Sequence, residues 1–222
     1  MKKFILPLVL LASLTSCSVK PELRKDIKAF IANFSLEESV KEYQTGGYIQ
    51  TTVEVGEKST TKEIVEMSYS LIDSEHPTYQ ETTTKYVNDK LKSTVEVVFV
   101  QNESGCYIST NGELKESSVK ECKKLITKFF YKQTSVDGQY HTQGWYYGDY
   151  LKEVAPVLQK YVTIDQEQEL YIYEYTVTEK KSGVETKIHQ NYKVNKLGML
   201  EENHYSMENE TKTKTIDIIV HK

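Results

Sequence analysis

The chain has 222 residues, 17 of them tyrosine, and a formal net charge of −4 at pH 7. A mildly acidic chain is a poor partner for nucleic acid, because phosphate binding calls for clustered Lys and Arg. The same composition argues against a polybasic patch as the means of membrane attachment. Only 10 glycines and 4 prolines interrupt a chain rich in β-branched and aromatic residues, which favours long strands.

The first 17 residues have the pattern of an export signal. A basic start at Lys2 and Lys3 precedes an apolar run from Phe4 to Leu14, and Leu14-Thr15-Ser16-Cys17 follows. This last segment resembles a bacterial lipobox, which implies cleavage before Cys17 and a diacylglyceryl group on its thiol. The alternative is an ordinary signal peptide with a cysteine nearby. The run is shorter than the roughly 20 apolar residues that a membrane-spanning helix needs.

These features predict how the chain is divided and where it resides. We expect a signal peptide at residues 1–16, a lipidated tether at residues 17–20 and a single α+β domain at residues 21–222. The expected location is the extracytoplasmic face of a cell membrane, held by the lipid anchor. The Lys-, Tyr-, Thr- and Ile-rich composition is typical of a Gram-positive or related low-GC bacterium.

The domain is expected to begin with a helix. Apolar residues recur at helical spacing from Leu23 through Ile27, Phe30 and Ile31 to Phe34. The segment 35–38 has the form of a capping box, which restarts or continues the helix, and the glycine pair at 46–47 ends it.

Nine strands are expected in two groups, because the apolar period changes from helical to two. Short turns between long strands favour antiparallel neighbours. The first group is 48–55, 62–72, 78–88, 91–100 and 106–110, and the second group is 169–179, 185–195, 199–206 and 212–221.

Two further helices are expected between the strand groups. Ser118 opens a second capping box, and the apolar stripe behind it runs from Val119 to Phe130. After a loop rich in Gly and Tyr, Asp149 is placed to cap a third helix that carries Leu151, Val154, Val157, Leu158 and Tyr161.

Cys106 and Cys122 remain once Cys17 is assigned to lipid. In an oxidising exterior, two leftover cysteines are candidates for a disulfide. The alternative is a pair of buried free thiols.

The sequence supports no enzyme and no cofactor. It lacks the glycine-rich phosphate loops, the GxSxG and HExxH patterns and the CxxC pair, and its five histidines are scattered without ligand spacing. Glu201, Glu202 and His204 come nearest to an acid–base cluster, but polar neighbours favour a solvated surface for them.

The segment Trp145-Tyr146-Tyr147 is the most unusual feature of the central loop. Aromatic side chains on a loop stack on sugars or cover an apolar ligand, and the alternative is that they pack over the mouth of the sheet.

The order of helix, meander, helices and second meander resembles the LolA/LolB-like fold, which mycobacterial LppX-type lipoproteins share. The resemblance implies a strongly curved antiparallel half-barrel of about nine strands, packed on about three helices around an apolar cavity for acyl chains. It includes no diagnostic motif, so no binding residue of the family is transferred. The sole arginine, Arg24, does not match the arginine of the periplasmic carrier.

Two functions follow as hypotheses. The first is a non-catalytic, membrane-anchored lipoprotein that binds or carries a hydrophobic ligand. The second is a surface interaction or adhesion lipoprotein with a filled core and a protein partner, including a membrane complex. The first hypothesis places the ligand against apolar and aromatic side chains of the helices and the central loop: Phe30, Ile31, Phe34, Phe129, Phe130, Trp145 and Tyr146.

Overall fold

The computed structural model describes residues 22–70, 77–102, 105–130, 134–136, 139–141 and 144–222. The predicted signal peptide, the tether and Cys17 lie outside the described residues. Among the helices that the structure describes, none combines the length and the apolar character that a membrane crossing requires.

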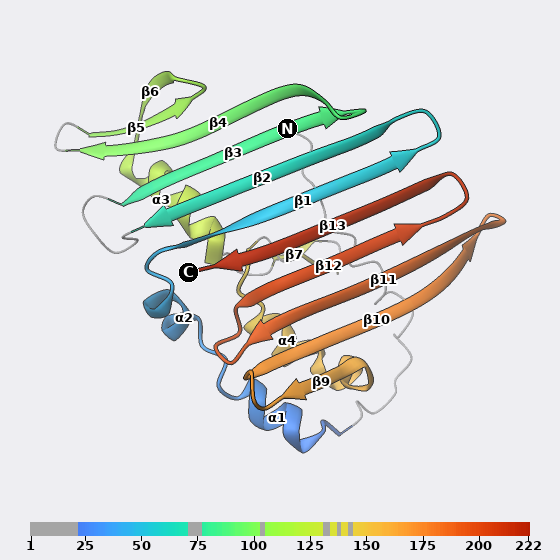
Figure 1. Ribbon diagram of the computed structural model, residues 1–222. Helices are drawn as coiled ribbons and strands as arrows, with labels where there is room; N and C mark the ends of the chain where they lie inside the picture. Colours follow the sequence, from blue (N-terminus) through green and yellow to red (C-terminus); the bar gives the residue numbers. More distant parts are fainter. Residues whose placement is uncertain (1–21, 71–76, 103–104, 131–133, 137–138, 142–143) are drawn as a thin grey trace.

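One open antiparallel sheet of eleven strands forms the body of the molecule (Figure 1). Its spatial order is β6-β5-β4-β3-β2-β1-β13-β12-β11-β10-β9, so that the first and last long strands pair at the centre. The strands are β1 (Gly46–Gly56), β2 (Thr60–Ser70), β3 (Thr78–Val87), β4 (Lys90–Asn102), β5 (Gly105–Thr110), β6 (Glu113–Ser117), β9 (Val162–Asp165), β10 (Leu170–Lys181), β11 (Val184–Asn195), β12 (Leu200–Glu208) and β13 (Lys212–His221).

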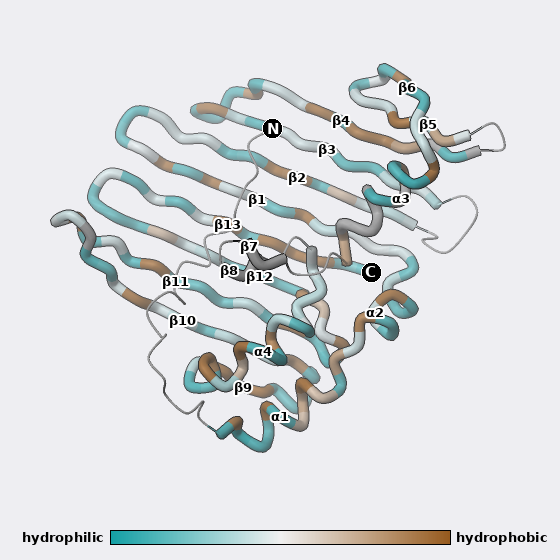
Figure 2. Tube along the Cα trace, turned by 180° about the vertical axis from the view of Figure 1, so that it is seen from behind, coloured by the Kyte–Doolittle hydropathy of each residue, from teal (hydrophilic) through white to brown (hydrophobic). Residues whose placement is uncertain are grey.

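The helices lie on one face of the sheet, toward one end of the long strands (Figure 2). A short hairpin of β7 (Thr134–Val136) and β8 (Gln139–His141) forms a separate two-stranded sheet. The helices are α1 (Lys25–Ile31), α2 (Leu36–Glu42), α3 (Val119–Thr127) and α4 (Gly148–Leu158), with 3-10 turns η1 (Lys128–Phe130) and η2 (Gln159–Tyr161).

Local sequence explains where two of these helices begin. The hydroxyl of Ser35 accepts a hydrogen bond from the amide of Glu38 at 3.2 Å, which caps α2 as expected. Ser118 caps α3 in the same way through the amide of Glu121 at 3.2 Å. The expected cap of α4 is wrong, because Tyr147 holds the capping position and Asp149 lies in the first turn.

The expected architecture is correct in outline and wrong in its count of elements. The nine predicted strands are present, and the sheet gains β6 and β9 as its two edges and stays open. Within the described residues, four α-helices replace the expected three, because the first predicted helix is divided into α1 and α2.

The apolar interior lies between the helices and the sheet face that they cover. Successive side chains of a strand point to opposite faces, so strand register assigns each residue to a face. Two clusters of buried side chains result. The first joins α1 and α4 to β9–β13, and the second joins α2, α3 and η1 to β1–β5.

Candidate functional site

The predicted ligand-binding residues of α1 and of the segment that follows it lie in the first cluster. Phe30, Ile31 and Phe34 are buried, and the rings of Phe30 and Phe34 meet edge to face at 5.9 Å. Phe34 also meets the ring of Tyr171 on β10 at 6.5 Å. The apolar face of α1 and the ring of Phe34 therefore pack against the sheet.

The predicted residues that follow α3 lie in the second cluster. Phe129 and Phe130 are buried and contact Tyr69 of β2, with ring centroids 4.9 and 6.3 Å away. Tyr146 is buried in the same cluster. The seven predicted residues are therefore not brought together at one place.

Trp145 lies where the two clusters meet. It is half-buried, packs against both clusters and contacts the ring of Tyr48 at 4.8 Å. The backbone of Trp145 is fixed on both sides, because its amide donates to the carbonyl of Phe129 and its carbonyl accepts from the amide of Leu200. The central aromatic loop is thus built into the seam between the clusters.

Three buried side chains on the helix-covered face of β10, β11 and β12 have polar atoms that make no hydrogen bond. Within the part of the chain that the structure describes, the side-chain amide of Asn203 and the hydroxyls of Tyr171 and Tyr192 have no hydrogen-bond partner. All three are at most 2% exposed. Such atoms are rare in native proteins and call for a water molecule or a ligand group.

Sequence reasoning missed Asn203, although it alternates with Tyr205 and Met207 on one face of β12. The register between β11 and β12 shifts at Lys193 and Val194, before the regular pairs that include Asn203, so the shift does not change this alternation. Asn203 lies opposite Tyr192 and Ile218, both buried. The alternate tyrosines of β10 were an available signal for the Tyr171 hydroxyl, whereas Tyr192 is the one tyrosine of β11.

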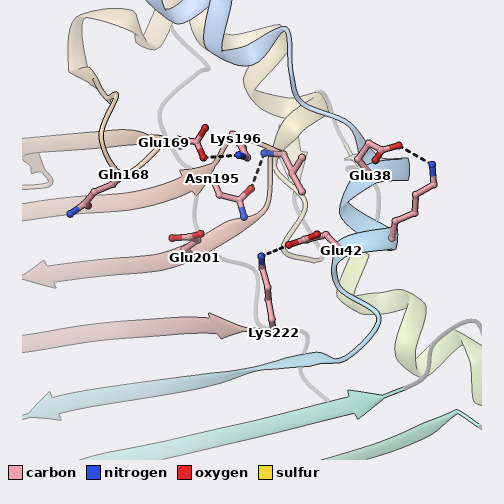
Figure 3. Close-up of a pocket in the computed structure, with 10 residues that line it drawn as sticks. Glu38, Glu42, Gln168, Glu169, Asn195, Lys196, Glu201 and Lys222 are labelled. Carbon is pink, nitrogen blue, oxygen red and sulfur yellow. Dashed lines mark hydrogen bonds and ion pairs between the residues drawn. The ribbon is translucent and has the colours of Figure 1, made fainter.

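A polar pocket of about 500 Å³ opens where the β11–β12 turn meets α2 (Figure 3). It is lined by four carboxylates and three ammonium groups, and by none of the seven predicted residues. The lining residues are Glu38, Lys41, Glu42, Gln168, Glu169, Asn195, Lys196, Leu197, Glu201 and Lys222.

Ion pairs occupy the ammonium groups of this pocket. Lys196 Nζ lies 2.6 Å from Glu169, and Lys222 Nζ lies 2.7 Å from Glu42 (Figure 3). The bond from Lys222 holds the pKa of the Glu42 carboxyl below its usual value. Because charges of both signs alternate and are exposed, the pocket presents no strong field of one sign to a ligand.

Beside the pocket, hydrogen bonds join Asn195 at the end of β11 to the second cluster. Asn195 donates to the hydroxyl of Tyr43 at 2.9 Å, and the carbonyl of Tyr43 accepts from the hydroxyl of Tyr69 at 2.7 Å. Burial, reinforced by the charge of Glu201, raises the pKa of Tyr43 to about 12. This chain of bonds positions the β11–β12 turn, and its groups already have partners.

The two remaining cysteines form a disulfide. It joins Cys106 of β5 to Cys122 of α3, with 6.7 Å between the Cα atoms. Both residues are buried in the second cluster. The bond therefore fixes α3 to the sheet.

The histidine that the sequence singled out lies on the opposite face of the sheet. His204 Nδ1 is 2.5 Å from Asp217 Oδ1, and both side chains are exposed. Among the residues that the structure describes, no group of three or more His, Cys, Asp or Glu is placed to hold a metal ion.

Comparison with known proteins gives little further information. No family model and no curated protein matches the chain. A candidate outer membrane lipoprotein-sorting protein domain from Vibrio parahaemolyticus shares 7% identity at a TM-score of 0.21, with 87% of this chain and 92% of that chain covered. A beta-barrel-like protein of a domain of unknown function from Brucella abortus shares 8% identity at a TM-score of 0.23, with 79% and 97% covered. Because both TM-scores are low, we transfer neither fold nor function from these proteins.

Proposed function

We propose that this protein is a lipoprotein, anchored at the extracytoplasmic face of the cell membrane, that binds or carries an apolar ligand without catalysing a reaction. The observation that supports this most is the division of the interior into two apolar clusters that meet at Trp145. A domain of this size usually buries one contiguous core. A seam between two clusters, with a half-buried aromatic side chain in it, is a place where an apolar chain can insert.

The single tryptophan makes this proposal directly testable. The chain contains one Trp, so its emission reports on Trp145 alone. We expect 1-bromododecane to quench this emission in a saturable way in the full-length protein held in lipid-free amphipol. Dodecane, which lacks the heavy atom, is the matched control and should compete without quenching. Quenching that stays linear in the concentration of 1-bromododecane would contradict the proposal.

A conservative substitution in the first cluster tests whether its wall contacts the ligand. Phe30→Leu keeps an apolar side chain and should lower the free energy of unfolding by less than about 1.5 kcal/mol. If α1 lines the ligand site, the same change alters the affinity for 1-bromododecane measurably. An unchanged affinity would remove α1 from the site.

The anchor is tested separately from ligand binding. The basic start, the apolar run and the lipobox-like segment support acylation of Cys17. We expect Cys17→Ser to leave an unprocessed precursor that incorporates no labelled fatty acid in cells. A normally cleaved or labelled variant would refute the lipoprotein assignment.

One observation favours the second function, a surface interaction protein. Ile49 and Ile219 are direct partners on neighbouring central strands, and they are 41% and 57% exposed. Both point away from the helices, so they form an apolar spot on the open face of the sheet. A photo-crosslinker at position 219 that captures one defined surface protein in living cells, lost with Ile49→Thr, would support this function.

A further inference from the structure

The helix-side face of β10, β11 and β12 combines unused polar atoms with an otherwise apolar surface. Asn203 and Tyr192 are direct neighbours across the β11–β12 ladder, and Tyr192 stacks on Tyr173 of β10 at 4.6 Å. Tyr171 lies two residues before Tyr173, on the same face. The three side chains with unused atoms thus belong to adjoining strands of one buried surface.

Burying these polar atoms without hydrogen bonds lowers the stability of the protein substantially. Each buried donor or acceptor without a partner costs about 1–3 kcal/mol, and Asn203 alone keeps a carbonyl and an amino group unused. Replacing such a residue with an apolar one of similar shape is close to neutral or stabilising. A function that uses the amide therefore explains its presence better than packing does.

The chemistry of the three groups identifies what they would bind. Burial and the neighbouring tyrosines raise the pKa of Tyr192 well above its usual value, so its hydroxyl stays neutral and donates or accepts. The buried polar residues that the structure describes include no charged side chain. Arg24, whose charge acts on Tyr171, is paired with Asp26 at the surface. A charged ligand group would lose its hydration here without gaining a counter-ion.

We infer that Tyr171, Tyr192 and Asn203 form a polar subsite for an uncharged hydrogen-bonding group, a hydroxyl or an ester, on a ligand that is otherwise apolar. This inference rests on the proposed function and specifies its ligand class as neutral amphiphiles. Phe34 and Ile218, two buried side chains of the first cluster, take the apolar part.

Competition against bound 1-bromododecane tests the subsite in the full-length protein in amphipol. Recovery of Trp145 emission gives the affinities of 1-dodecanol and dodecane, which differ by one hydroxyl. We expect the wild-type protein to prefer the alcohol about tenfold, the value of one buried hydrogen bond. Asn203→Leu should reduce this preference to less than about threefold and change the affinity for dodecane little.

Two further variants keep the result interpretable. Tyr192→Phe removes one hydroxyl of the subsite and should also lower the preference, which matters if Asn203→Leu does not fold. Tyr205→Phe is the matched control: Tyr205 lies on the same face of β12, two residues beyond Asn203, and its hydroxyl is not among the unused buried atoms. Its preference should equal that of the wild-type protein.

The possible failures are distinct. Wild-type protein that binds dodecane and dodecanol equally, or Asn203→Leu and Tyr192→Phe variants that keep the full preference, would overturn the subsite and leave the proposed function standing. In that case internal water molecules satisfy the three groups. Wild-type protein that binds neither compound would contradict the proposed function itself.

Discussion

At the scale of single residues, two glycines in turns allow the cost of backbone strain to be distinguished from the cost of steric crowding. Gly198 and Gly183 both have positive φ, at +95° and +87°. A methyl group on Gly198 would lie 3.0 Å from both Gly148 and Tyr146, whereas one on Gly183 would meet nothing within 4 Å. Gly198 is therefore required both by its backbone conformation and by close neighbours, whereas Gly183 is required by its backbone conformation alone.

We predict that Gly198→Ala destabilises the protein by about 1–3 kcal/mol more than Gly183→Ala. The shared part, about 1–2 kcal/mol, is the cost of a left-handed backbone, and the excess reports the crowding at Gly198. Urea unfolding of both variants measures the difference. Equal losses would show that the β11–β12 turn does not pack on α4 and Tyr146 as described.

Glu54 provides a test of pH dependence. Its carboxylate lies 2.9 Å from Lys214 and 3.0 Å from Lys212, and the hydrogen bond from Lys214 is the main cause of a pKa below the usual 4.5. A lowered pKa means stability that is complete above pH 4.5 and lost as the pH falls through the folded-state pKa.

We therefore predict that Glu54→Gln lowers the free energy of unfolding by less than about 1 kcal/mol at neutral pH. The difference from wild type should shrink as the pH falls below 4.5. Glu66→Gln, on the exposed face of β2, is the control and should change little at either pH. If the stability difference between wild type and Glu54→Gln grew as the pH fell, the result would contradict the ion pairs of Glu54 with Lys212 and Lys214.

The sequence predicted which apolar residues are buried, but it did not predict the buried polar residue Asn203. Phe30, Ile31 and Phe34 were expected in the interior and are buried there, because helical spacing records burial directly. Asn203 was missed although it shares a strand face with Tyr205 and Met207, because a single polar residue in a period-two pattern does not show whether its own side chain is buried. Whether any of these residues binds a ligand stays a prediction.

At the scale of elements, the long hairpins were predictable and the sheet edges were not. Long strands alternate apolar and polar residues and end at clear turns. In β6, by contrast, Glu113 to Glu116 are all exposed, and β9 is four residues long. These edge strands are held by backbone hydrogen bonds to one neighbouring strand, and such bonds do not require a recognisable residue pattern.

The disulfide is the main covalent tie between elements. It closes a 16-residue separation between β5 and α3, for which loop entropy predicts about 3 kcal/mol. We expect urea unfolding of the wild-type protein with and without dithiothreitol to differ by about 2–4 kcal/mol. The double variant Cys106→Ala, Cys122→Ala should be insensitive to the reductant. Equal stability of oxidised and fully reduced wild type would contradict a structural role for the bond.

At the scale of the whole molecule, the two halves of the sheet each carry their own helices. α1 and α4 cover β9–β13, while α2 and α3 cover β1–β5, and the two clusters meet at Trp145 and Val220. Binary patterning and loop length were enough to predict this α+β class with helices on one face. The split into two clusters depends on tertiary packing that no local pattern specifies.

The central claim is that the interior takes up a neutral apolar ligand, and native mass spectrometry of full-length protein purified from its own membrane tests it most directly. We predict two kinds of added mass: a covalent one at Cys17, and a second that collisional activation releases as an uncharged lipid. Protein that carries only the covalent mass, and still takes up no 1-dodecanol when exposed to it, would contradict the claim.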